Sequence, residues 1–151
     1  MTPIDDRVEP VVREALAAAA KKNPERFQQA IAAFPDDESI IKGIRLAAAV
    51  ALFALHDAHD GRKPTNAELT EIAADMAEDE DWTDITSDEV VKYATAAYDK
   101  VQFDQVLPME RVIILAFVVA ANLLASYRGD DEEWWDYLDR AEAVIEATPE
   151  S

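Results

Sequence analysis

The chain has 151 residues, with 32 Asp and Glu against 14 Lys and Arg, and it contains no cysteine. This length fits one domain with a hydrophobic core of its own, and an apolar content of 50% excludes a disordered acidic tail. The lack of cysteine excludes disulfides, thiolate nucleophiles and cysteine-ligated zinc.

The negative charge is concentrated in the C-terminal part of the chain. Residues 1–63 carry ten acidic and nine basic side chains, whereas residues 64–151 carry 22 acidic and five basic ones. Like charges that crowd together repel one another and oppose a compact fold. The asymmetry therefore indicates either a cationic partner or a need for solubility.

The pattern of apolar residues predicts an all-α fold, a single compact bundle of about seven helices that spans residues 1–151. Residues 1–35 are expected to form an N-terminal helix pair. The first helix covers about residues 6–22, and the second begins at Asn23-Pro24 and ends before Pro35. Residues 36–151 are expected to form a helical core with an acidic face.

Two apolar helices, at about residues 38–59 and 108–128, are expected to be buried at the centre of this bundle. Their most apolar stretches, residues 44–55 and 112–125, are shorter than the roughly 18 residues expected of a spanning helix. The N-terminus shows no basic segment leading into an apolar one, as a secretory signal would. We therefore predict a soluble, cytoplasmic protein with no membrane association.

The remaining helices are predicted from their caps. Thr65 and Glu68 form a capping box for the fourth helix, and Thr86 and Glu89 form one for the fifth. The seventh helix is expected from about Asp131 onward. Residues 44–61 also align with residues 112–129, which suggests a pseudo-twofold pair of helical hairpins. Chance similarity between two core hairpins is the simpler explanation.

His56, His59 and Asp60 are the one place where nitrogen and oxygen ligands occur together. Their spacing puts them on one face of a helix, where they could hold a divalent metal ion. The alternative, which we favour, is that the histidines interact with the negative end of the helix dipole and the Asp side chains are simply exposed.

The turn at Asp60-Gly61, followed by the capping Glu68, resembles the helical tellurite-resistance TerB family. The second turn departs from that family, because Arg128 stands where an Asp is expected. The N-terminal helices and the spacing between the two turns also differ from the family pattern. The resemblance implies binding of divalent metal through acidic turns.

Two acidic segments contain tryptophan. Residues 75–89 include eight acidic side chains around Trp82, and residues 130–139 include Trp134 and Trp135 among six. A helical projection puts Trp134 on the core stripe and Trp135 at its acidic edge. For residues 75–89 the alternative is a solvated loop. For Trp135 the alternative is ordinary packing against a neighbouring helix. The candidate partner-binding residues are Trp82, Asp131, Glu132, Trp135, Asp136 and Asp139.

The sequence thus predicts a non-catalytic acidic module that binds a basic macromolecular surface, as inhibitors, immunity proteins, antitoxins and nucleic-acid mimics do. It shows no phosphate-binding glycine loop and no Ser-His-Asp pattern. Direct binding to nucleic acid is not expected, since the acidic half would repel phosphate. The alternatives are a divalent-metal-binding helical domain and acidity that serves solubility alone. No other cofactor is expected, and a homodimer formed through the apolar helices stays open.

Overall fold

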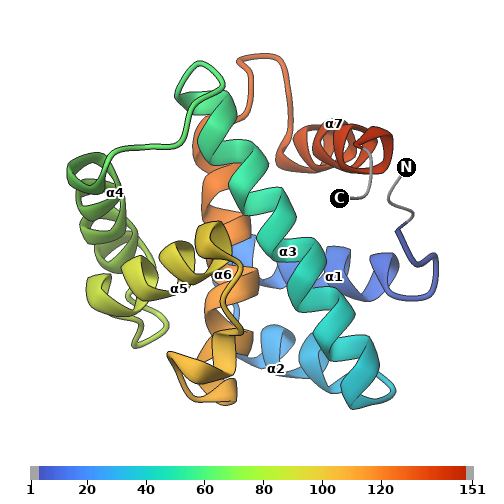
Figure 1. Ribbon diagram of the computed structural model, residues 1–151. Coiled ribbons are helices and arrows are strands. Elements are labelled where there is room, and N and C mark those ends of the chain that lie inside the picture. Colours follow the sequence, from blue (N-terminus) through green and yellow to red (C-terminus); the bar gives the residue numbers. More distant parts are fainter. Residues whose placement is uncertain (1–3, 149–151) are drawn as a thin grey trace.

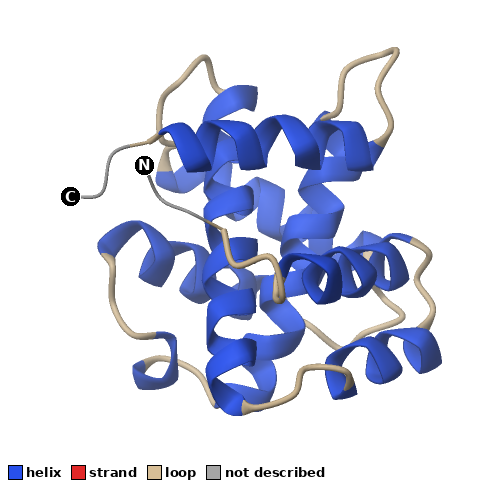
Figure 2. Cartoon of the chain, turned by 90° about the vertical axis from the view of Figure 1, so that its right-hand side faces the viewer, coloured by secondary structure: helices blue, strands red, loops and turns tan. Residues whose placement is uncertain are grey.

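The computed structural model describes residues 4–148, and this part of the chain is helical, with no strand (Figures 1 and 2). The elements are α1 (Glu9–Ala20), α2 (Pro24–Ala32), α3 (Asp37–Ala58), α4 (Asn66–Asp79), α5 (Ser87–Asp99), the short 3-10 helix η1 (Phe103–Gln105), α6 (Met109–Tyr127) and α7 (Trp134–Ala147). The predicted all-α bundle of about seven helices is confirmed.

The core is built around α6, which packs against α3 and α1 (Figure 1). Ten side chains of α6 are buried, because this helix is apolar on nearly all sides and finds cover on several of them. In α1, Val12, Ala15 and Leu16 are fully buried in the same cluster of side chains. The N-terminal helix pair is therefore part of one continuous core.

The predicted caps set the helix starts. Thr65 and Glu68 exchange hydrogen bonds of 3.1 and 2.8 Å between side chain and backbone, and Thr86 and Glu89 do so at 3.2 and 3.1 Å. The Asn23 side chain accepts from the backbone N–H of Arg26 at 3.0 Å. These bonds satisfy donors that the first turn of a helix leaves free.

The seventh helix begins at Trp134, three residues later than predicted. The Gly129 backbone N–H donates to Glu132 Oε1 at 2.9 Å, and the Glu132 N–H donates to the Gly129 carbonyl at 3.1 Å. These two bonds close a turn over residues 129–132, so the helix starts only after it.

The two similar hairpins pack differently. α4 packs chiefly against α5, whereas α7 packs against α3 and α6. Gly61 adopts a positive φ of 83°, and its N–H donates to the His56 carbonyl at 2.7 Å; Gly129 does not adopt such a conformation. These differences favour chance similarity over an internal repeat.

Candidate functional site

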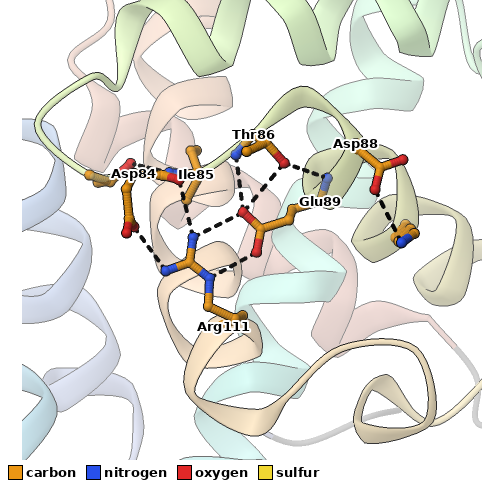
Figure 3. Close-up of polar contacts among 8 residues, drawn as sticks. Asp84, Ile85, Thr86, Asp88, Glu89 and Arg111 are labelled. Carbon is orange, nitrogen blue, oxygen red and sulfur yellow. Dashed lines mark hydrogen bonds and ion pairs between the residues drawn. The ribbon is translucent and has the colours of Figure 1, made fainter.

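The acidic segment 75–89 divides into a paired and an unpaired part. Arg111 of α6 donates to both carboxylate oxygens of Glu89, at 2.8 and 2.9 Å, and to Asp84 at 2.8 Å (Figure 3). Asp88 forms an ion pair with Lys92 at 3.1 Å. The Arg111 contacts tie the start of α5 to α6, and the Asp88–Lys92 pair lies within α5, so the C-terminal part of the segment has a structural role.

Glu80 and Trp82 also have a structural role. Glu80 is only 5% exposed, and its two carboxylate oxygens accept from Trp82 Nε1 at 2.7 Å and from Asn122 Nδ2 at 2.8 Å. The half-buried Trp82 ring meets Phe27 edge-on, with ring centroids 5.7 Å apart. Trp82, predicted to bind a partner, thus fixes the loop after α4 to α6 and α2.

The unpaired carboxylates of this region form what we call the α4 ridge. It consists of Glu71, Asp75, Glu78 and Asp79 on one side of α4 and Asp81 just after it. All five residues are exposed, and none of their carboxylates forms an ion pair with a cation of the described residues. The spacing of the first three, i, i+4 and i+7, was visible in the sequence as an acidic stripe.

An aromatic side chain lies beside this ridge. Burial raises the pKa of the Tyr127 phenol, and the nearby Asp75 carboxylate raises it further. Tyr127 is the last residue of α6 and is half-buried. The α4 ridge therefore has an aromatic neighbour, although it is not the tryptophan that the sequence suggested.

The α7 segment presents fewer free charges than predicted. Arg140 donates to both oxygens of Glu132 at 3.0 and 3.2 Å, and the Glu133 N–H donates to Asp136 at 3.1 Å. Asp139 accepts from Arg13 of α1 at 2.7 Å. Three of the predicted partner-binding carboxylates are thus engaged within the protein.

Asp131 and Trp135 remain available on this side of the molecule. Asp131 is exposed and has no partner among the described residues. Trp135 is 45% exposed and meets the half-buried Trp134 edge-on, with ring centroids 5.6 Å apart. The predicted difference between the core-facing Trp134 and the edge residue Trp135 is confirmed.

Glu142 of α7 is buried and only 8% exposed. Its Oε1 accepts from Arg13 at 3.2 Å, and its Oε2 is buried without a hydrogen-bond partner. Burial raises the pKa of Glu142 to about 8, and the neighbouring Glu9 carboxylate contributes to this rise. Glu142 is therefore largely protonated near neutral pH.

The predicted partner-binding residues do not form one surface. Trp82 lies in the loop between α4 and α5. Figure 1 shows these two helices on the left and α7 at the upper right, on the other side of α3 and α6. The larger set of free carboxylates is on the α4 side. The α4 ridge is therefore the stronger candidate for a binding surface.

The structure does not gather His56, His59 and Asp60 into a ligand set. The His56 ring stacks on Tyr98 at a centroid distance of 5.5 Å, and His59 Nδ1 lies 2.6 Å from the Leu55 carbonyl oxygen. Within residues 4–148, no group of three His, Asp or Glu side chains is placed to hold a metal ion. Metal binding at these residues stays a prediction from sequence alone.

The acidic position shared with the TerB pattern, Glu68, is engaged in the protein. Its carboxylate accepts from Arg62 at 2.8 and 3.0 Å and from the Thr65 N–H at 2.8 Å. Arg62, with Thr65, lowers the pKa of Glu68 to about 2. Glu68 thus stabilises the turn before α4.

No protein-family model matches the chain, and neither the curated proteins nor the solved structures include a match. α3 and α6 are each long and apolar enough to cross a membrane by length and composition alone, and about half of the most apolar part of each is buried in the fold. Core helices of soluble proteins have the same properties, so a cytoplasmic location stays a prediction.

Proposed function

We propose that this protein is a non-catalytic interaction module whose α4 ridge binds a basic surface on another macromolecule. The observation that carries the proposal is the five exposed carboxylates that have no cation, Glu71, Asp75, Glu78, Asp79 and Asp81. Elsewhere in the C-terminal half, Arg111 and Arg140 pair with nearby carboxylates. Other unpaired carboxylates, such as Asp99, Asp131 and Glu146, lie on separate elements.

The position of the ridge opposes stability. Glu78 and Asp79 lie in the last turn of α4, which contains no basic residue. The C-terminal end of a helix carries partial negative charge, so acidic side chains there are unfavourable. Asp75 also lies four residues from both Glu71 and Asp79, and like charges at this spacing repel. Lys22 donates to the Asp79 backbone carbonyl at 2.7 Å and so offsets part of the charge at this helix end, but no cation pairs with the five carboxylates themselves. Carboxylates that repel one another and have no cation of their own are available to a basic partner.

The chemistry of the ridge specifies a partner surface rich in Arg and Lys. Guanidinium and ammonium groups form charge-assisted hydrogen bonds with carboxylates, and Arg also stacks on aromatic rings such as Tyr127. A direct contact with nucleic acid would be repelled by the same charges. A protein of this kind would act as an inhibitor, antitoxin or immunity protein that occupies the nucleic-acid-binding surface of its partner.

The test compares two triple variants that remove the same charge. Glu71→Gln/Asp75→Asn/Glu78→Gln neutralises the ridge, and Asp99→Asn/Asp131→Asn/Glu146→Gln neutralises three other exposed, unpaired carboxylates. The probe is a ten-residue peptide of alternating Arg and Gly, and its affinity is measured by calorimetry. At about 0.5 kcal/mol per exposed pair, we expect the ridge variant to bind about tenfold more weakly than the control.

Equal losses in the two variants would show that the peptide responds only to net charge, and the proposal would fail. A larger loss in the control would move the binding surface to the α7 side, since Asp131 and Glu146 lie there. Thermal melts exclude misfolding as the cause. Because the ridge charges repel one another, the ridge variant is expected to gain about 1 kcal/mol of unfolding free energy.

A further inference from the structure

A concave apolar groove lies between α3, the C-terminal end of α5, η1 and the start of α6. Its volume is about 610 Å³, and its walls include Ile44 and Leu52 of α3, Ala97 of α5, Phe103 of η1 and Val112 of α6. Figure 1 shows α5 and the segment after it running beside α3. Small-molecule sites are typically apolar hollows of about 300–1,000 Å³, so this groove has their size and character.

Exposed apolar side chains gather at this groove. Among the described residues, six large apolar side chains are exposed, and Ile41, Val101 and Met109 are three of them that line the groove. A fourth, Val106, lies with Val101 at a smaller hollow that shares lining residues with the groove. Exposed apolar surface that is grouped in a concave place is typical of a binding site.

The groove also holds two of the few free cations. Fourteen Lys and Arg side chains are present, and within the described residues only Lys21, Arg45 and Lys100 form no ion pair, hydrogen bond or ring contact. Arg45 and Lys100 both line the groove. In a chain with 32 acidic residues, these two cations therefore remain available to an external anion at an apolar hollow.

The end of α5 places Lys100 at the groove. Lys100 ends α5 in the left-handed conformation, with φ of 57°. Glycine or asparagine is usual at such a helix end, because other residues meet steric hindrance there. The left-handed backbone lets the Val101 N–H donate to the Ala96 carbonyl at 3.0 Å, and it leaves Lys100 at the groove with its ammonium group unpaired.

We propose that the groove binds a small amphiphile with an apolar chain and a carboxylate head. The chain would lie along the apolar walls, and the head would be held by Arg45 and Lys100. Asp104 also lines the groove, and it forms no ion pair with either cation. An acidic helix of a partner protein fits less well, because two cations would not offset the repulsion from a chain of net charge −18.

The first test measures calorimetric binding of dodecanoate, dodecanol and dodecyltrimethylammonium, with the two ionic compounds below their micelle concentrations and dodecanol below its solubility limit. A protein of this charge repels anions overall, so preference for the carboxylate requires local cations. We expect dodecanoate to bind about tenfold more tightly than dodecanol. Equal affinity for all three, or preference for the ammonium compound, would overturn the proposal.

The second test locates the site with variants. Arg45→Gln/Lys100→Gln is expected to lose the preference for dodecanoate and to keep the affinity for dodecanol. Lys21→Gln, which removes the third free cation outside the groove, is expected to keep both. Ala49→Phe, which fills the groove, is expected to lose both, with circular dichroism confirming that it folds.

If the double variant and Lys21→Gln behave alike, the head does not bind at these cations and the proposal is wrong. Sedimentation gives a further check. A ligand-free dimer that Ile41→Asp converts to monomer would show that a second copy of the chain covers the groove, which also contradicts the proposal. Failure of these tests would leave the proposed function of the α4 ridge unaffected, because the ridge consists of other residues.

Discussion

Replacing Glu142 by glutamine is expected to stabilise the protein at pH 9 and to leave its stability almost unchanged at pH 5. Glu142 is buried, and its folded-state pKa of about 8 is far above its ordinary value of 4.5. The folded state then binds a proton that the unfolded state releases, so the wild-type protein loses stability as the pH rises from about 4.5 to 8. Glutamine cannot ionise and removes this loss.

The size of the gain at pH 9 is expected to be about 2 kcal/mol, on the scale of a buried polar group without a partner. Glutamine keeps the oxygen that accepts from Arg13 at 3.2 Å, so this contact is retained. Urea unfolding of wild type and variant at both pH values measures the effect. Asp139→Asn is the control: Asp139 also accepts from Arg13, but its side chain is 62% exposed. A gain of equal size at pH 5 and pH 9 would contradict the account.

Replacing Glu80 by glutamine is expected to destabilise the protein by about 2 kcal/mol. Each carboxylate oxygen of Glu80 accepts from one donor, Trp82 Nε1 on one side and Asn122 Nδ2 on the other. Glutamine offers one oxygen and one NH2 group, so one of these two donors faces another donor in a buried place. Losing a hydrogen bond to a charged group costs about 1.5–3 kcal/mol.

The matched control is Glu78→Gln, which makes the same chemical change two residues earlier at an exposed side chain with no partner. It is expected to leave the unfolding free energy unchanged or slightly raised. The pair Glu80→Gln/Asn122→Asp restores a donor opposite an acceptor, so it should recover part of the loss. If Glu80→Gln is no more destabilising than Glu78→Gln, the loop after α4 is not held by these bonds.

Local signals in the sequence predict much of the fold. Capping boxes such as Thr65 with Glu68 act within four residues, and the apolar pattern of α6 specifies burial without knowledge of its neighbours. α7 begins at Trp134 and not at the predicted Asp131. The Glu132 side chain accepts from the Gly129 N–H and closes a turn before the helix. An acidic side chain can either begin a helix or close such a turn, and the composition of the segment does not distinguish the two.

The site is harder to predict, because the state of each carboxylate depends on contacts distant in sequence. Asp139 and Glu142 both contact Arg13, more than 120 residues away, and Glu80 contacts Asn122. A count of acidic residues cannot distinguish a free carboxylate from one that a distant residue neutralises. The sequence could not single out Arg45 and Lys100 either, because it does not show that most of the other cations have partners distant in sequence.

The two proposed surfaces use charge in opposite ways. The α4 ridge contains carboxylates that form no ion pair with a cation, and the groove beside α3 contains two cations that form no ion pair with a carboxylate. Both depart from the mutual pairing that Arg111 and Glu89 illustrate in Figure 3. Departures of this kind from local stability are expected where a protein binds something else.

The most direct test of the proposed function is a titration of the ¹⁵N-labelled protein with the Arg-Gly peptide, followed by NMR amide shifts residue by residue. The account predicts saturable shifts confined to residues 71–81 and the adjacent end of α6 around Tyr127. Shifts centred on α7 around Asp131 and Trp135, or small shifts spread over all exposed acidic residues, would contradict it.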